Sequence, residues 1–327
     1  MKVSLLALLR VIAAAAVMCA HSATFIACAQ TYPVKPIRIV VGFTPGGVAT
    51  SVARLLGSKL SESLGQNVII ENRGGASGAI ANEMVAKLPP DGYTLLIVGA
   101  TAAVLPSLRN NLPYDLERDL TAISLVSNAP FVLVVHPSVP ARSASELIAL
   151  AQARPGKVSF GSVGVGSTPH LMAELFRMMA KLDIMHVPYK GGSENAVANA
   201  SGQVEMSFLS APSLQPLIGG NRVRALAVSS AKRVSFLPGL PALSESLPGY
   251  DYANWNGVTA PAALPKDIVA RLNAVIVKMA AAPDVKELFN QQGMEPLSST
   301  PEQFAAFLRN EVAKNAKLVQ AIGIKAE

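Results

Sequence analysis

IVVGFTPGGVATSVAR, residues 39–54, is the stretch that decides the fold of this chain. Its opening residues up to Phe43 favour a β-strand, and a turn through Pro45-Gly46-Gly47 leads directly into a helical pattern. Aliphatic side chains recur at every fourth position from Val52 to Leu64, which places them on one helix face, and Gly65 ends the helix. The stretch therefore predicts a strand, a glycine turn and a helix in immediate succession.

A junction of this kind leaves the first N–H groups of the helix unpaired at the carboxyl end of the strand. Together with the positive end of the helix dipole, they can hold an anion without any charged side chain, and glycine lets a ligand approach the backbone closely. A tight turn that only reverses the chain is the simpler interpretation of a single junction.

The junction recurs along the first hundred residues. Residues 68–71 read as a strand that runs into the glycine-rich segment 72–78, and residues 93–98 read as a strand that ends in Gly99-Ala100-Thr101. Alternating strands and helices favour a parallel, doubly wound sheet with a cleft beyond its strand ends.

The amino-terminal segment indicates export. Lys2 and Arg10 precede and interrupt an apolar run over residues 5–26, and an A-x-A-type cleavage site ends at Ala29. We therefore expect residues 1–29 to be a signal peptide that is cleaved near Ala29, which places the mature chain in the periplasm. A membrane anchor and a lipoprotein acylated on Cys28 are the alternatives, although the lipoprotein motif lacks its expected leucine.

Composition narrows the function further. Half of the 327 residues are hydrophobic and 15% are charged, so the chain can bury the cores of two ordinary domains. Both cysteines lie within residues 1–29, so the mature chain needs neither a disulfide framework nor a thiolate metal site. The formal charge of +7 falls to +5 once Lys2 and Arg10 are removed. Because the basic residues are dispersed and aromatics make up 5%, we expect no nucleic-acid binding but a weak attraction for anionic ligands.

A second unit begins near Asn128 and repeats the strand–helix architecture. A capping box at Ser143 predicts a helix over residues 144–153, and a strand over residues 157–161 leads into a glycine-rich segment where Thr168, as N-cap, opens another helix. Residues 231–265 suit a return crossing between the lobes and a surface wrap, and the terminal helices, the last capped by Thr300, are expected to pack on the first unit. We therefore predict two lobes: a discontinuous one of residues 30–128 with 231–327, and a second of residues 129–230.

Signals for catalysis are weak. No H-E-x-x-H pair and no G-x-S-x-G elbow occurs, and the segment GVGSTP lacks the Gly-Lys-Ser/Thr of a phosphate loop. His136 and His186 adjoin strands and are interpreted as structural, whereas His170 opens a helix in a glycine-rich loop, where it could contact a ligand or serve a capping role. We expect no enzymatic activity, no cofactor and no metal. An exported hydrolase that uses Ser77 or Ser167, with His170 as base, is the alternative.

Several motifs carry a resemblance to a known family. They are YPVKPIR at residues 32–38, PGG at 45–47 with Ala53-Arg54, ENRGG at 71–75, PDGYTLL at 90–96, HVPYKGG at 186–192, ALAV at 225–228 with Lys232-Arg233, WNG at 255–257 and APA at 260–262. In this combination, which covers essentially the whole mature chain, the sequence resembles the extracytoplasmic solute receptors of tripartite tricarboxylate transporters, also called the Bug family.

The resemblance implies an α/β protein with the two-lobed periplasmic binding protein fold (type II-like), each lobe a mainly parallel sheet flanked by helices. It implies a monomer that captures a small carboxylate in an interlobe cleft, through main-chain groups, hydroxyls and ordered water. The implied partners are the membrane subunits of the transporter or a sensor kinase. The predicted ligand-binding residues are Phe43, Thr44, Pro45, Gly46, Gly47, Thr50, Gly75, Ala76, Ser77, Gly78, Thr101, Gly166, Ser167, Thr168, His170 and Ser210.

The chain departs from the family pattern at two places. Many relatives carry Asp where this chain has Thr50, and many have Phe-Asp where this chain continues from Phe208 to Leu209 and Ser210. Because both carboxylates are missing, a ligand with an ammonium group is disfavoured. We therefore hypothesise a purely anionic or aromatic carboxylate ligand.

Overall fold

The computed structural model describes residues 32–43, 45 and 48–324. The predicted signal peptide, residues 1–29, lies outside the described residues, as do Thr44, Gly46 and Gly47. Among the described residues, no helix combines the length and the apolar character that crossing a bilayer requires. The elements in chain order are β1 (Ile37–Val41), α2 (Val48–Leu64), β2 (Val68–Asn72), η1 (Ala76–Gly78), α3 (Ala79–Ala86), β3 (Thr94–Gly99), α4 (Ala100–Leu108), β4 (Leu120–Ala129), β5 (Phe131–Val135), α5 (Ala144–Ala153), β6 (Val158–Ser162), α6 (Thr168–Met179), β7 (Ile184–Pro188), α7 (Gly192–Ala200), β8 (Met206–Ser210), α8 (Ala211–Ile218), β9 (Arg224–Val228), η2 (Leu243–Glu245), β10 (Asn254–Pro261), α9 (Lys266–Ala281), α10 (Pro283–Gln291), β11 (Glu295–Pro296) and α11 (Pro301–Ile322).

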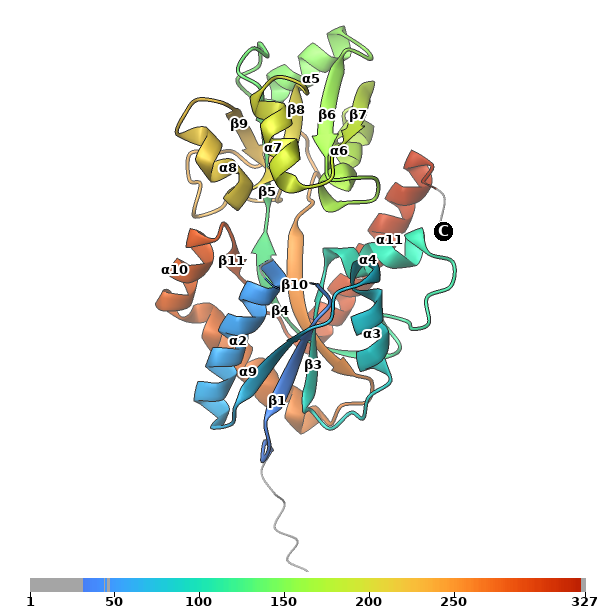
Figure 1. Ribbon diagram of the computed structural model, residues 1–327, viewed down its shortest axis with the longest axis vertical. Coiled ribbons are helices and arrows are strands. Elements are labelled where there is room, and N and C mark those ends of the chain that lie inside the picture. The colour runs from blue at the N-terminus through green and yellow to red at the C-terminus, as the bar shows by residue number, and fades with distance from the viewer. Residues whose placement is uncertain (1–31, 44, 46–47, 325–327) are drawn as a thin grey trace, which may run out of the picture. The chain divides into compact units, whose positions relative to one another are not determined.

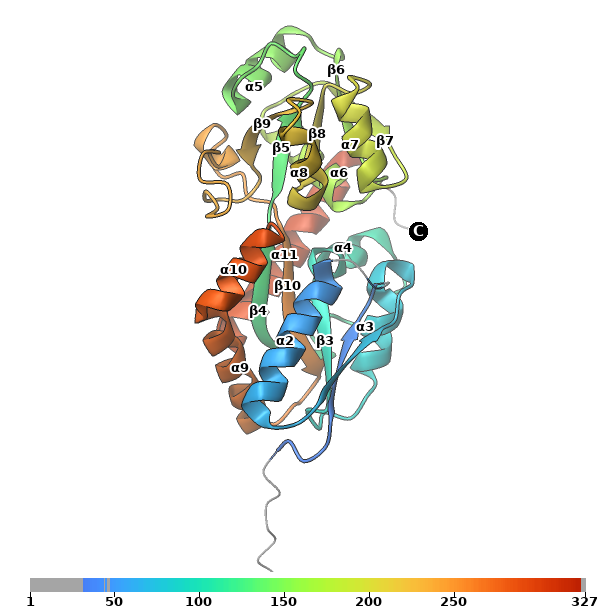
Figure 2. The same ribbon diagram turned by 60° about the vertical axis from the view of Figure 1, so that its left-hand side comes forward.

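The first sheet, which we call sheet 1, has the strand order β11-β4-β10-β3-β1-β2 (Figure 1). β1 pairs in parallel with β2 and β3, whereas β10 runs antiparallel to β3 and β4. Val40, Leu96 and Val98 belong to one cluster with side chains of α3, α4 and α11. On the other face of the sheet α2 and α9 lie side by side (Figures 1 and 2). Helices therefore cover both faces of sheet 1.

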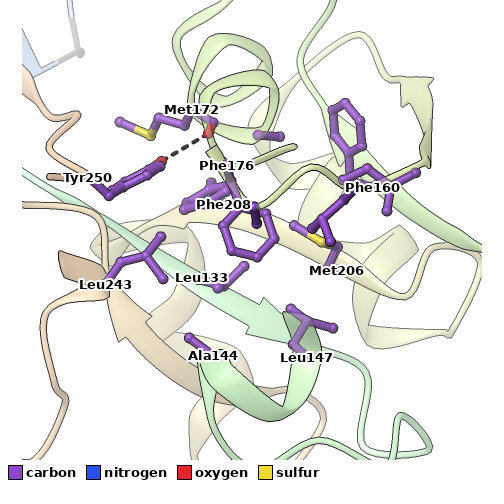
Figure 3. Close-up of a cluster of buried hydrophobic side chains, with 14 of the residues drawn as sticks. Leu133, Ala144, Leu147, Phe160, Met172, Phe176, Met206, Phe208, Leu243 and Tyr250 are labelled. Atoms are coloured by element: carbon purple, nitrogen blue, oxygen red, sulfur yellow. Dashed lines mark hydrogen bonds between the residues drawn. The ribbon is translucent and has the colours of Figure 1, made fainter. Parts of the chain in front are cut away.

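The second sheet, sheet 2, has the strand order β7-β6-β8-β5-β9. β6 is parallel to β7 and β8, and β5 is antiparallel to β8 and β9. One face packs on α5 and α6, where Phe160, Phe176 and Phe208 are fully buried (Figure 3). The opposite face packs on α7 and α8 through side chains such as Val132 and Leu214.

Helix α11 contributes to the packing of both sheets. Phe304 and Leu308 in its first half pack in the cluster of sheet 1, and Leu318 and Val319 in its last turns pack in the cluster of sheet 2. The helix begins as the sequence predicts, because the Thr300 hydroxyl accepts a hydrogen bond from a backbone N–H three residues on, which completes a capping box. The terminal helix therefore packs on the first unit, as predicted, and on the second as well.

The predicted fold class, two-lobed α/β with helices flanking each sheet, is confirmed. Both sheets combine parallel and antiparallel strands, so neither is doubly wound throughout. In sheet 1, the antiparallel pair β4 and β10 lies within the strand order. The interpretation of residues 231–265 as a surface wrap is wrong where it covers β10, which is almost entirely buried. The lobe boundaries remain a prediction.

Two local predictions need correction. The N-cap of α6 is Ser167 rather than Thr168, which is the first helical residue. Thr101 lies in the first turn of α4 rather than in an open turn, because the helix starts immediately after β3.

Candidate functional site

Parallel pairing brings the carboxyl ends of β1, β2 and β3 to one edge of sheet 1, where each strand turns into a helix. Asn72 ties two of these junctions together. Its Nδ2 donates to the carbonyl oxygen of Phe43 at 2.8 Å and to Oγ1 of Thr50 at 2.9 Å. The predicted site residues Phe43 and Thr50 are therefore neighbours, and the Thr50 side chain, 1% exposed, is held in the first turn of α2.

The junction after β2 has an unusual backbone. Gly75, Ala76, Ser77 and Gly78 have φ angles of 141°, 49°, 57° and 95°, a run of four positive values. For residues with a Cβ such a conformation costs on the order of 1–3 kcal/mol each, and it persists where surrounding structure enforces it. Gly42 supplies that enforcement, since a Cβ built on it would lie 2.9 Å from Cα of Gly78. This junction is therefore clamped against the end of β1, with the Ser77 side chain exposed.

Three helices of the second unit begin around one cavity of about 200 Å³ at the carboxyl ends of the parallel strands β6 and β8. The N-cap residues of α6, α7 and α8, which are Ser167, Gly191 and Ser210, make no side-chain hydrogen bond to the start of their helices. The described residues that line the cavity are Phe131, Val163, Pro169, Gly192, Asn195, Phe208, Leu209, Ser210 and Ser213. None of these side chains is charged, so the positive ends of three helix dipoles set the potential there.

The loop between β6 and α6 contains the predicted residues Gly166, Ser167 and Thr168. The Ser167 hydroxyl donates to the carbonyl of Gly164 at 2.6 Å, and the N–H of Gly166 donates to Nδ1 of His170 at 3.1 Å. On the side of the first unit the loop meets α4, because a Cβ on Gly166 would lie 3.1 Å from Cδ1 of Leu108.

His170 is buried beneath this loop. Its ring lies 4.1 Å from that of His186, centroid to centroid, and His186 is stacked on Phe160 at 4.9 Å. Burial, helped by the positive charge of Arg177, lowers the pKa of His170 to about 4. Burial and the neighbouring His170 also lower the pKa of His186 to about 4. Both rings are therefore neutral at pH 7. His170 and Glu174 lie 3.8 Å apart but form no ion pair at that pH, because the imidazole carries no charge.

A second cavity, of about 390 Å³, is lined by α2, α8, the end of α10 and the loop residues Phe236 and Leu237. Val48 and Ser51 in the first turn of α2 line it together with residues of α8, beginning at Ala211. No charged side chain is among the described residues that line it. The first turn of α2 and the start of α8 therefore line the same cavity.

The structure groups the predicted residues into sets. Phe43, Thr50 and the residues 75–78 gather at the edge of sheet 1, and Ser210 lines the cavity of about 200 Å³. His170 faces the core of the second unit rather than a cavity. Sequence reasoning missed Val163, Gly192, Asn195 and Ser213 as lining residues. The glycine pair at 191–192 before a helix was the available signal for α7, since it has the same strand–glycine–helix form as the other junctions.

The arrangement does not favour hydrolysis. Ser167 Oγ and His170 Nδ1 are each hydrogen-bonded to backbone groups of their own loop rather than to each other. The serine–histidine contact of this region is between Ser162 Oγ and His186 Nε2, at 2.6 Å, and Ser162 is fully buried. A buried hydroxyl beside a histidine that resists protonation cannot attack a substrate from solution.

Comparisons with known proteins show the family and the fold. The family model of the tripartite tricarboxylate transporter family receptor matches residues 52–324. Protein BugT of Bordetella pertussis is 37% identical over 300 residues, which cover 91% of this chain and 92% of BugT. The structure of R. palustris Rpa4515 with adipate has a TM-score of 0.75 and 34% identity, covering 90% of this chain and all of that one. MatC (Rpa3494) from Rhodopseudomonas palustris with bound malate has a TM-score of 0.70 and 27% identity, covering 88% of this chain and all of that one.

Proposed function

Because the chain belongs to the tripartite tricarboxylate transporter receptor family, we propose that it is a periplasmic receptor whose ligand is a small carboxylate, held between loops of its two lobes. The family consists of solute-binding receptors that work with transporter components. The proposal adds the site: the junctions at residues 43–47, 75–78 and 164–168, together with Thr50, Thr101 and Ser210.

One observation carries the proposal. Three helices whose N-cap side chains make no capping bond start around one cavity, and none of the described residues that line it is charged. A carboxylate placed there would accept hydrogen bonds from backbone N–H groups and would be attracted by three helix dipoles. Charge-assisted hydrogen bonds of this type are roughly twice as strong as neutral ones.

The ligand class follows from the side chains that surround the junctions. Thr50 at the start of α2 and Ser210 at the end of β8 each carry a hydroxyl rather than a carboxylate. An ammonium group would therefore find no carboxylate partner at these two positions. Two solved relatives were determined with adipate and with malate, neither of which has an amino group.

Isothermal titration calorimetry of the mature chain tests this function. Adipate, malate, citrate and benzoate form the panel, with aspartate and glutamate as amino-acid comparators. We expect at least one member of the panel to bind and to raise the melting temperature, and we expect both amino acids to bind more weakly. Tight binding of aspartate or glutamate, with no binding by the panel, would refute the proposed ligand class.

The receptor role also predicts the absence of turnover. After prolonged incubation with the protein, the bound carboxylate should be recovered unchanged by mass spectrometry. The alternative hydrolase would release products from carboxylic esters, and replacement of Ser77 or Ser167 by alanine would abolish that release.

Export and oligomeric state complete the proposal. We propose that the chain is cleaved near Ala29 and acts as a monomer, and amino-terminal sequencing and light scattering of the periplasmic protein test both points. A mature chain that begins with an acylated Cys28 would show the lipoprotein alternative instead.

A further inference from the structure

One buried polar side chain in the cavity of about 200 Å³ has an unused hydrogen-bonding group. Asn195, on the first turn of α7, is 1% exposed and lines this cavity. Its Oδ1 accepts a hydrogen bond of 3.0 Å from the Ser207 hydroxyl. Among the described residues, none accepts a hydrogen bond from its Nδ2. Among the described residues, the fully buried side-chain atom without a partner is Oδ1 of Asn199, so Nδ2 of Asn195 keeps some accessible surface, and the residue lines the cavity.

The fold makes room for this amide. A Cβ built on Gly161 of β6 would lie only 2.0 Å from Oδ1 of Asn195 and 2.9 Å from Oγ of Ser207. Any residue other than glycine at position 161 would therefore displace the Asn195 side chain. Three features together fix the position of the amide: the absence of a side chain at Gly161, the hydroxyl of Ser207 and the helix start at Gly192.

No carboxylate is among the described side chains that line this cavity with Asn195. The hydroxyls of Ser210 and Ser213 are hydrogen-bonded to each other at 3.0 Å. Glu194 comes directly before Asn195 on α7. Its carboxylate accepts a hydrogen bond of 3.0 Å from the N–H of Lys190 and does not line this cavity. The cavity therefore offers donors from three helix starts and one amide, with no acidic acceptor from the protein among its lining residues.

We propose that Asn195 is a specificity-determining residue of the receptor, whose Nδ2 donates to an anionic group of the ligand in the lobe of sheet 2. The inference rests on the proposed function and adds a side chain to a site otherwise built from backbone and hydroxyl groups. Its amide selects for a ligand group that accepts hydrogen bonds, and its Oδ1 is kept from the ligand by Ser207.

Asn195→Asp is the sharpest test, because it changes the charge and almost nothing of the shape. The new carboxylate keeps an acceptor for the Ser207 hydroxyl but replaces the donor with a negatively charged oxygen. The matched control is Ser193→Asp, which adds the same charge two residues earlier on the same helix turn, at an exposed position outside the cavity. Asn195→Ala removes the donor without adding charge.

Calorimetry with adipate and malate at pH 7.5 provides the readout, and thermal melting without ligand checks that each variant is folded. We expect Asn195→Asp to weaken binding of the tighter probe at least tenfold and Asn195→Ala to weaken it about fivefold. Ser193→Asp should stay within about twofold of the parent. If Asn195→Asp does not fold, the comparison between Asn195→Ala and Ser193→Asp decides the question.

Parent-like affinity of Asn195→Asp, or of Asn195→Ala where it alone folds, would overturn the inference. An equal loss of affinity in Ser193→Asp would also overturn the inference. The loss would then come from added negative charge on α7 in general rather than from the amide of Asn195. A failure of the proposed function would look different, because the parent protein itself would then bind none of the carboxylates. The inference about Asn195 would fail with it.

Discussion

The backbone N–H of Gly166 donates a hydrogen bond of 3.1 Å to Nδ1 of His170, so a buried imidazole holds the loop that opens α6. The bond requires Nδ1 to be an acceptor, which means that the ring must be unprotonated there. Burial lowers the pKa of His170 to about 4, and the stacked His186 has a similarly lowered pKa. The loop therefore depends on a histidine that stays neutral over the physiological range.

Acid should destabilise this region at a predictable pH. Because the folded-state pKa of about 4 lies below the ordinary value of 6.5, the unfolded chain binds more protons between these two pH values. The stability that the neutral ring provides is therefore complete above pH 6.5 and is lost as the pH falls toward 4, by about 3 kcal/mol for His170.

Thermal melts of the parent and of His170→Asn at pH 7 and pH 4.5 check this prediction. The asparagine can still accept from Gly166 but cannot gain a charge, so the variant should be less stable at pH 7 yet lose less stability on acidification. Glu174, 3.8 Å from His170 and paired with Arg177 at 2.7 Å, is unchanged in both proteins. An equal loss of stability in the two proteins would contradict the prediction.

Gly42→Ala should damage the site of the first lobe. The new Cβ would approach Cα of Gly78 to 2.9 Å and displace the junction at residues 75–78, so we expect a loss of about 1–3 kcal/mol in stability and a severalfold weaker carboxylate affinity. Gly65→Ala is the control, because Gly65 has a φ of +69° and no neighbour within 4 Å. It should cost about 1 kcal/mol of stability and leave the affinity unchanged. Unaltered binding by Gly42→Ala, measured by calorimetry, would show that the junction is not part of the site.

Tyr252→Phe tests a buried contact between the segment before β10 and α11. The Tyr252 hydroxyl donates to Oδ1 of Asn315 at 2.7 Å, and both residues are almost completely buried. Removing the donor leaves a buried acceptor unpaired, so we expect about 1–3 kcal/mol less stability in urea denaturation. Tyr189→Phe, at a partly exposed tyrosine, should change stability by less than about 0.5 kcal/mol. Similar effects of the two substitutions would refute the importance of the buried bond.

Thr50→Asp should shift the ligand preference. The carboxylate keeps an acceptor for Nδ2 of Asn72 but places a negative charge in the first turn of α2, beside Phe43. We expect adipate and malate to bind about tenfold more weakly and aspartate to gain relative to them in calorimetry. Ser58→Asp, exposed on the same helix, is the control and should leave the preference unchanged. An unchanged ratio in Thr50→Asp would contradict the role of Thr50 in excluding ammonium groups.

The strand–glycine–helix junctions could be predicted because their signals are local. β1 is aliphatic except at Arg38, α2 repeats aliphatic residues every fourth position, and Gly65 ends the helix with its N–H bonded to the carbonyl of Ser61.

β4 and β10 could not be predicted, because their buried faces are partly polar. Asn256 of β10 donates to Oγ of Ser127 on β4 at 3.0 Å, and Ser124 and Thr259 are likewise fully buried. Each polar residue has its partner on another segment, over a hundred residues away in the case of Asn256 and Ser127. A single stretch of sequence then shows neither the alternation of a half-buried strand nor the apolar run of a buried one.

The same reason limited the prediction of the site. Backbone junctions are visible in the sequence, whereas Asn195 joins the site only because Gly161 and Ser207, on two other elements, leave room for it and orient it. The position of His170 was visible in its loop, but its burial against His186 depends on the pairing of β6 with β7.

Amide resonances of the isotope-labelled mature chain, titrated with adipate or malate, test the central claim most directly. The account predicts that one carboxylate shifts the N–H signals of Gly42, Ser77 and Gly78 in the first lobe together with those of Gly164, Gly192 and Ala211 in the second, with a common dissociation constant. Shifts confined to one lobe, or shifts in both lobes with different dissociation constants, would contradict it.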